Sequence, residues 1–255
     1  MCYDNDARPP VPPVSGSARG EDIILTAADG NRFAAYVGHP EKPTGAQIVI
    51  FPDVRGLHQF YKELAIRFGE TGTTAIAIDY FGRTAGTGPR DDSFEFWPHV
   101  QQMQAAGLEA DANAAFDYLR QGEGANNPTF TVGFCMGGTL SLLTATRPVG
   151  LAGAIGFYAG LTRALPAFGG ATLLEQAKNI KYPVLGLFGG ADQGIPVSDV
   201  EKFNQELHKA GIEHSITIYP EAPHSFFDRR ADQYAEASAD AWQRVLAFIA
   251  DHSRK

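Results

Sequence analysis

The stretch from Phe130 to Thr139, FTVGFCMGGT, places a cysteine between two glycines, where a β-prone apolar run meets a helix-forming one. A strand that reverses sharply into a helix leaves no room for side chains beside the residue at the bend, which explains the glycines Gly133 and Gly137. The pattern Gly-x-Cys-x-Gly is that of the nucleophile elbow, with cysteine in place of the more usual serine. We therefore expect a strand, a tight turn at Cys135 and a helix that includes Leu140 to Thr146.

This turn places Cys135 at a helix N-terminus, where unpaired N–H groups and the positive end of the helix dipole favour a thiolate. The residue is thus a candidate nucleophile. The alternative is a buried structural cysteine at a tight strand–helix junction, since free cysteine is among the most buried residue types.

Strand-like and helix-like segments alternate from Gln47 onward, which predicts a mostly parallel sheet with helices on both faces. Two alternating runs at 22–28 and 32–38, around Ala-Asp-Gly-Asn, indicate an antiparallel N-terminal hairpin. Besides the run before Gly133, the further expected strands are 47–51, 74–80, 150–158, 182–188 and 214–219, and the further expected helices are 60–70, 100–121, 173–178, 197–210 and 233–252. The irregular segments 81–98 and 161–171 are long enough to be binding loops.

A chain of 255 residues at this composition is compatible with one large α/β domain. We assign residues 21–255 to that domain and residues 1–20, which are polar and rich in proline, to a loosely held arm. The arm has no apolar core of the kind that a secretory signal needs. The two cysteines, Cys2 and Cys135, form neither a disulfide framework nor a dithiol centre, so we expect a cytoplasmic protein.

The net charge of −8 argues against nucleic acid as a partner, because a nucleic-acid-binding surface is basic. No apolar run approaches the roughly 18 residues that a membrane-spanning helix needs. A small-molecule substrate is the partner that we expect, with the chain a monomer or a weak homo-oligomer.

Three reactive side chains follow strands of the expected sheet: Cys135, Asp192 in Gly-Gly-Ala-Asp, and His224 in Ala-Pro-His-Ser-Phe. Loops beyond the carboxyl ends of parallel strands meet at one edge of the sheet. Nucleophile, acid and histidine in this chain order match the triad of α/β hydrolases, so an α/β-hydrolase fold is expected. Asp192 could instead cap a helix or form a turn, and His224 could lie in a plain surface loop.

In such a triad His224 takes the proton of Cys135 and later donates one to the leaving group, while Asp192 fixes the imidazole tautomer. An oxyanion hole needs two N–H donors. The amide of Met136, directly after the nucleophile, is one candidate, and that of Val54, in the turn after 47–51, is the other.

These motifs, together with Ile-Asp-Tyr-Phe-Gly-Arg at 78–83, resemble those of the dienelactone hydrolase family, and the resemblance covers nearly all of the chain after Gly20. Members of that family open cyclic enol-lactones, and relatives hydrolyse other esters. The resemblance implies a carboxymethylenebutenolidase-like hydrolase with the triad Cys135, Asp192 and His224. It also implies that Arg83 binds a substrate carboxylate; a surface ion pair is the alternative for this residue.

Two departures from the family pattern affect the expected substrate. The family glutamate that helps to activate the thiol corresponds to the shorter Asp53, which could alternatively be a plain turn residue. An arginine four residues after the catalytic histidine is replaced by Asp228, which puts dienelactone itself in doubt. Arg55 stands where the family usually has an apolar side chain and adds a charge at the mouth of the pocket.

Around the expected pocket, Ser225 follows the catalytic histidine, and aromatic side chains could form apolar walls or simply belong to the core. His58 follows the oxyanion turn and could line the pocket, but we favour a surface position for it. No histidine has metal-ligand spacing, so neither a metal nor a cofactor is expected. The candidate wall residues are Phe94, Phe96, Trp97, Phe157 and Tyr158.

The sequence thus favours a cysteine-dependent hydrolase of small esters or lactones that forms an acyl-thioenzyme. A non-catalytic small-molecule-binding protein with the same fold is the alternative. A nucleotide-binding Rossmann protein is disfavoured, because the glycine spacing at 133–138 is wrong and no basic side chain flanks the turn.

Overall fold

The computed structural model describes residues 6–14, 16–164 and 170–254, and within them eight strands form one sheet. The strand order is β1-β2-β4-β3-β5-β6-β7-β8. The first two strands form the expected hairpin, and β2 also pairs antiparallel with β4, whereas all other neighbours are parallel. The strands are β1 (Ala18–Thr26), β2 (Arg32–Pro40), β3 (Gln47–Phe51), β4 (Thr74–Ile78), β5 (Thr129–Phe134), β6 (Gly153–Phe157), β7 (Val184–Gly189) and β8 (His214–Tyr219).

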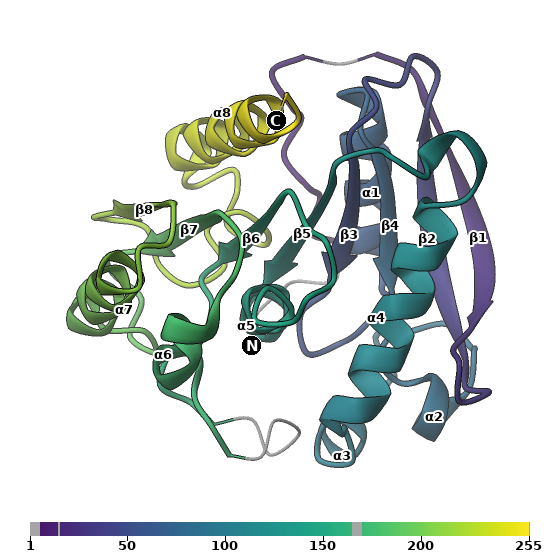
Figure 1. Ribbon diagram of the computed structural model, residues 1–255, viewed down its shortest axis with the longest axis horizontal. Helices are drawn as coiled ribbons and strands as arrows, with labels where there is room; N and C mark the ends of the chain where they lie inside the picture. The colour runs from purple at the N-terminus through teal and green to yellow at the C-terminus, as the bar shows by residue number, and fades with distance from the viewer. Residues whose placement is uncertain (1–5, 15, 165–169, 255) are drawn as a thin grey trace.

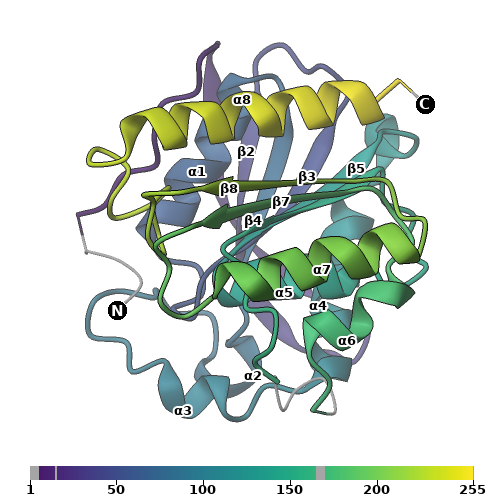
Figure 2. The same ribbon diagram turned by 90° about the vertical axis from the view of Figure 1, so that its left-hand side faces the viewer.

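Helices cover both faces of this sheet, as Figures 1 and 2 show: α1 and α8 lie on one face, and α4, α5 and α7 on the other. Strands β3, β5, β6 and β7 are buried along their whole length, which is why they are continuous apolar runs without alternation. The helices are α1 (Gln59–Glu70), α2 (Gly82–Ala85), α3 (Trp97–Val100), α4 (Ala105–Leu119), α5 (Met136–Thr144), α6 (Leu173–Gln176), α7 (Val197–Lys209) and α8 (Ala235–His252), with single 3₁₀ turns at Gly122–Gly124 and Ala177–Asn179.

The fold class is therefore confirmed, and most expected elements agree with the structure to within a few residues. The single helix expected over 100–121 is wrong. The chain forms the short α3, turns, and enters α4 through Gln104, whose backbone is extended (φ −130°, ψ 142°). A new helix thus begins at Ala105, and within its first turn the carbonyl of Gly107 accepts from the guanidinium of Arg83 (3.0 Å).

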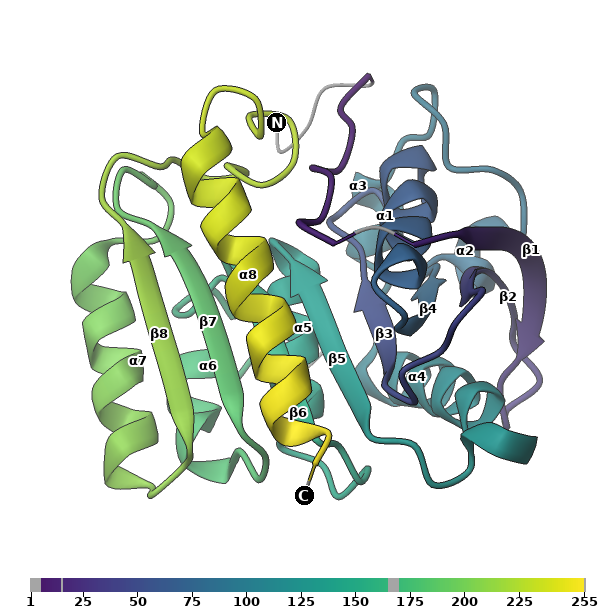
Figure 3. The ribbon, with the colours of Figure 1, turned by 90° about the horizontal axis from the view of Figure 1, so that it is seen from above.

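Two residues of the N-terminal segment 6–14 contact helices of the domain. Arg8 pairs with Glu63 on α1, and the indole of Trp242 on α8 donates to the carbonyl of Pro10 (2.9 Å). Figure 3 shows this purple segment between α8 and α1. Arg8 and Pro10 are thus in contact with the domain, and the interpretation of residues 1–20 as a loosely held arm stays a prediction. Strand β1 already begins at Ala18, and the division of the chain at residue 20 stays a prediction.

Residues 1–5 with Cys2, and residues 165–169 of the expected loop 161–171, lie outside the described residues. Among the helices of the described ranges, none has the length and apolar character needed to cross a membrane.

Candidate active site

The turn between β5 and α5 has the strained backbone that the glycine pattern predicts. Cys135 adopts φ 56° and ψ −118°, in the region that favours glycine, and it is the N-cap of α5. Its amide donates to the carbonyl of Phe157 (3.1 Å), which ties the turn to the neighbouring strand. A Cβ on Gly133 would lie 1.8 Å from the carbonyl oxygen of Gly137. A side chain at this glycine is therefore excluded, and Cys135, which is partly exposed, stands at the tip of the turn.

The same helix end is pressed against the turn that follows β3. A Cβ on Gly137 would lie 2.0 Å from the carbonyl oxygen of Phe51 and 2.1 Å from that of Pro52. The backbone that continues into Val54 and the first residue of α5, Met136, are therefore neighbours. Their role as the two donors of an oxyanion hole stays a prediction.

His224 and Asp192 meet from the loops after β8 and β7. Nδ1 of His224 lies 2.6 Å from Oδ2 of Asp192, whose side chain is only 2% exposed. The other carboxylate oxygen, Oδ1, accepts from the amide of Gly194 (2.8 Å), so the carboxylate is held from two sides. The two loops touch closely, since a Cβ on Gly189 would lie 2.3 Å from the carbonyl oxygen of Ala222. This arrangement orients the imidazole and fixes which ring nitrogen faces the acid.

Tyr158 and Ser225 also have positive φ values, 36° and 61°. The ring of Tyr158 lies 4.9 Å from that of His224, and its hydroxyl donates to Oδ2 of Asp228 (3.1 Å). Ser225 is fully buried. Strained backbone gathers at functional sites, and here it is found at the candidate nucleophile, at the residue after the histidine and at Tyr158, whose ring packs on the histidine. Tyr158 is fully buried as well, and the roles of Tyr158 and Ser225 in binding substrate stay predictions.

Asp53, Arg55 and His58 form a buried charged cluster in the turn after β3. Oδ1 of Asp53 accepts from the amide of Arg55 (2.9 Å), and its carboxylate lies 3.7 Å from Nε of Arg55 and 3.8 Å from Nε2 of His58. The surface position favoured for His58 is wrong: the residue is 8% exposed, because it caps α1 and its ring is enclosed by Arg55 and Tyr61.

Burial on its own raises the pKa of Asp53, but the hydrogen bond and charge of His58 and the charge of Arg55 outweigh it and lower the pKa. Burial lowers the pKa of His58, which Asp53 only partly offsets. At neutral pH the carboxyl of Asp53 is therefore ionised. Whether Asp53 activates the thiol stays a prediction.

Two buried tyrosines next to this cluster were not identified from the sequence. The hydroxyl of Tyr80 donates to the carbonyl of Pro52 (2.6 Å). Burial and the charges of Asp53, Asp79 and Cys135 raise its pKa well above the ordinary value. Tyr61 packs on Phe134, the residue before the nucleophile (ring centroids 5.7 Å apart). Tyr80 belongs to the Ile-Asp-Tyr-Phe-Gly-Arg motif, but no spacing rule gave it or Tyr61 a role, because only the packing of α1 and β4 brings them to the catalytic edge.

Arg83 is engaged by carboxylates of the protein itself. Nη1 and Nη2 donate to Asp29 (2.5 and 3.2 Å), and Nη2 also donates to Asp111 (2.8 Å). Both partners lie outside the loops that carry Cys135, Asp192 and His224. The ion pair considered as an alternative is therefore present, and a role in substrate binding stays a prediction.

Trp97 lies in α3 with 48% of its surface exposed, in ring contact with Phe96 (5.1 Å). Phe94 lies between Phe81 and His99, with the guanidinium of Arg90 4.6 Å above its ring. Phe81 is fully buried, and Phe94 and Phe96 pack against the core, so these rings tie the segment 81–104 to the domain. The role of Trp97 in binding substrate stays a prediction.

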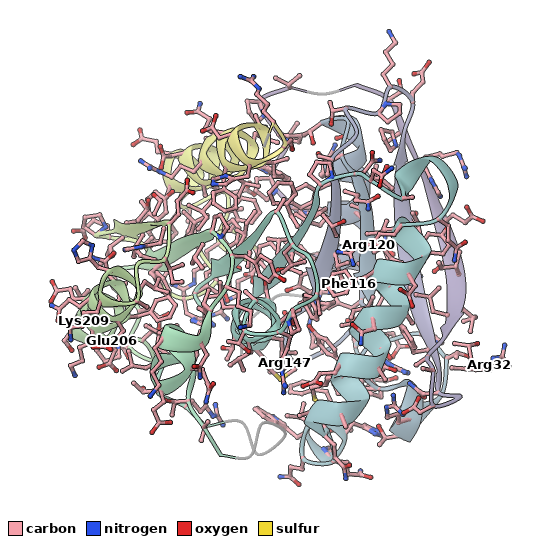
Figure 4. The ribbon with its side chains drawn as sticks, viewed as in Figure 1. Arg32, Phe116, Arg120, Arg147, Glu206 and Lys209 are labelled. Carbon is pink, nitrogen blue, oxygen red and sulfur yellow. The ribbon has the colours of Figure 1, made fainter. Side chains whose placement is uncertain are left out.

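A groove of about 430 Å³ between α4 and α5 lies apart from these groups. Phe116, Arg120 and Arg147, labelled in Figure 4, line it. Arg120 donates to the carbonyls of Val149 and Gly150 (2.8 and 2.7 Å) and thus holds in place the loop that contains these two residues. No candidate catalytic residue lines the groove, so its size does not identify the site. Within the described residues, no group of three or more histidine, cysteine or acidic side chains is placed to hold a metal.

Comparison with known proteins agrees with this geometry. The model of the dienelactone hydrolase family matches residues 33–253. The chain belongs to this family. It is 30% identical over 240 residues to carboxymethylenebutenolidases of Pseudomonas putida and Pseudomonas knackmussii, covering 90% of this chain and 96% of each relative.

A solved protein of Klebsiella pneumoniae, whose description assigns it provisionally to the dienelactone hydrolases, is 26% identical to this chain with a TM-score of 0.74. The match covers 92% of this chain and 99% of that protein. The family and the α/β-hydrolase fold expected from the sequence are thus confirmed. Membership of this family also confirms the expected class of enzyme, a hydrolase of esters or lactones.

Proposed function

We propose that this protein hydrolyses small esters or lactones with Cys135 as nucleophile, His224 as general base and acid, and Asp192 as the group that orients the histidine. One observation carries the proposal most directly: a cysteine on a strained elbow (φ 56°) shares the sheet edge with an imidazole held at 2.6 Å by a buried carboxylate. A fold kept only for binding has no need of this costly backbone.

In the first half-reaction the thiol proton passes to Nε2 of His224, since Nδ1 faces Asp192. The sulfur attacks the carbonyl carbon, and the amides of Met136 and Val54 stabilise the resulting oxyanion. The C–O bond to the leaving alcohol then breaks while His224 returns the proton to the alcohol oxygen. In a lactone this oxygen stays tethered, so the ring opens.

In the second half-reaction a water molecule attacks the thioester carbon, and His224 accepts a proton from the water. The C–S bond breaks, and the proton returns to sulfur. The products are a carboxylic acid and the restored thiol, so atoms and charge balance without a cofactor.

We further propose that neutral substrates are turned over better than carboxylate-bearing ones. Arg83, the arginine that would hold a carboxylate, donates to Asp29 and Asp111. The buried carboxylate of Asp228 is bonded to Tyr158, next to His224. Both features weaken the attraction of the site for an anion.

The test is a hydrolysis panel of short-chain aryl esters, simple lactones and dienelactones, with the Cys135→Ala variant as the blank. We expect burst release of the alcohol and a mass increase on Cys135 that equals the acyl group. Hydrolysis that survives both Cys135→Ala and treatment with iodoacetamide would remove the cysteine from the mechanism.

A further inference from the structure

A second polar cavity, of about 330 Å³, lies between α2, α3 and the first turns of α4. Its walls include Tyr80, Arg83, His99 and Asp111, and Met103 and Leu108 add apolar surface. This size is within the range of small-molecule sites. None of Cys135, Asp192 and His224 lines the cavity, which borders the catalytic turn only through Tyr80.

Asp111 is the most unusual group in this wall. The residue is 1% exposed, and Oδ1 accepts from Arg83 (2.8 Å) and from Nδ2 of Asn31 (2.9 Å). The second oxygen, Oδ2, is buried and has no hydrogen-bond partner among the described residues. A buried carboxylate oxygen without a donor is costly, so a donor from a ligand would lower the free energy of this site.

A second group in the same wall has the same property. Nδ1 of His99 is buried and has no hydrogen-bond partner within the described parts of the chain. The imidazole is fixed by stacking on Phe94, with ring centroids 5.0 Å apart and planes 15° from parallel. Two separate elements, α3 and α4, thus each contribute to the wall of this cavity a residue with a buried polar atom that lacks a partner within the described residues.

The charges around the cavity determine which kind of hydrogen-bond donor a ligand should carry. Asp29 and Asp111 contribute two negative charges, and Arg83 is the one positive charge among the described residues that line it. Arg83 is bonded to both carboxylates, so one negative charge remains in excess. A ligand that completes this arrangement carries a positive charge and N–H groups.

We propose that this cavity is a binding site for a small organic ammonium compound, whose N–H groups bond to Oδ2 of Asp111 and whose carbon chain lies against Met103 and Leu108. This cavity is connected to the turn after β3 through Tyr80. Tyr80 forms one of its walls, and the hydroxyl of Tyr80 is bonded to the carbonyl of Pro52 in that turn.

Ionisation of Asp111 gives the binding a defined pH dependence. Burial is the main cause that raises the pKa of this carboxyl to about 6, while Asn31 and Arg83 lower it and Asp29 raises it. The carboxyl is therefore about 10% ionised at pH 5 and almost fully ionised at pH 7.5. An ammonium ligand should bind about tenfold more weakly at pH 5 than at pH 7.5.

The experiment uses three probes of one size: propylammonium, 1-propanol and propionate. Each is titrated into the full-length protein at pH 7.5 and at pH 5, and amide chemical shifts are followed by NMR. We expect propylammonium to bind at least tenfold more tightly than the other two at pH 7.5, to shift the amides of residues 103–108, and to lose about tenfold in affinity at pH 5.

Asp111→Asn should abolish the preference for propylammonium, whereas Asp117→Asn, which changes an exposed acid on the same helix, should leave it unchanged. Equal binding of all three probes, or propylammonium binding that does not change with pH, would overturn the proposal. If Asp111→Asn does not fold, the pH dependence and the shift map of the unmodified protein decide the question.

Discussion

The elbow around Cys135 and the segment 81–104 are held in place by different kinds of force. At the elbow, glycines pack directly against backbone carbonyls, so the path of the chain depends on the absence of side chains. In the segment 81–104, charged side chains fix the path of the chain: Arg83 bonds to Asp29 and Asp111, and Arg90 bonds to Asp79. The comparison teaches that a local pattern specifies the first region, whereas the second depends on partners far away in sequence.

The largest effect is expected from Cys135→Ala. Loss of the nucleophile should lower kcat/KM for a short-chain aryl ester by on the order of 10³-fold or more, because no other group can form the acyl intermediate. Steady-state kinetics measures this loss. Thermal unfolding is the control and should remain close to wild type, since the residue is partly exposed.

Gly137→Ala tests whether the elbow is as intolerant as its geometry indicates. The new methyl group would overlap the carbonyl oxygens of Phe51 and Pro52, so we expect unfolding to become easier by about 3 kcal/mol and hydrolysis to fall with it. Denaturant unfolding gives the free energy. Gly88→Ala is the matched control, because no atom lies within 4 Å of the place that its Cβ would occupy. Equal stability of the two variants would contradict the packing account.

The Asp111→Asn variant tests the charged contacts of the segment 81–104 through the pH dependence of the protein's stability. The folded-state pKa of about 6 lies above the ordinary value of 3.8, so the folded protein holds this proton more tightly than the unfolded chain does. The resulting stabilisation is complete below about pH 4 and is lost as the pH rises through about 6.

We therefore expect Asp111 to reduce the stability of the wild-type protein between about pH 4 and pH 6.5 by on the order of 2–3 kcal/mol. Chemical unfolding at a series of pH values measures this trend, and the difference between wild type and Asp111→Asn isolates the contribution of this carboxyl. A difference that stays constant over this pH range would mean that the carboxyl is ionised in the folded protein well below about pH 6.

The smallest effect is expected from Arg83→Met on substrate choice. Because this guanidinium donates to Asp29, Asp111 and the carbonyl of Gly107, its loss should change kcat/KM for carboxylate-bearing and neutral esters by the same factor, to within about twofold. The ratio of the two kcat/KM values is the measurement. A selective loss for the carboxylate-bearing ester would instead support Arg83 as the group that binds the substrate carboxylate.

Much of the fold could be predicted because parallel strands buried on both faces are continuous apolar runs with clear bounds, as at Gln47–Phe51 and Val184–Gly189. The elbow could be predicted because a glycine on each side of a cysteine meets a steric requirement of the turn itself. The break between α3 and α4 could not, since the residues around Gln101 are compatible with a helix and the extended backbone of Gln104 appears only in the folded chain.

The sequence by itself determined the chain order of cysteine, acid and histidine, the strand ends that carry them, and the family. Only the tertiary structure decided that His58 is buried, that Arg83 faces the protein's own carboxylates, and that Tyr61 and Tyr80 border the catalytic turn. The physical reason is range: glycine spacing and apolar periodicity act over a few residues, whereas the partner of a charge depends on which distant segment folding brings beside it.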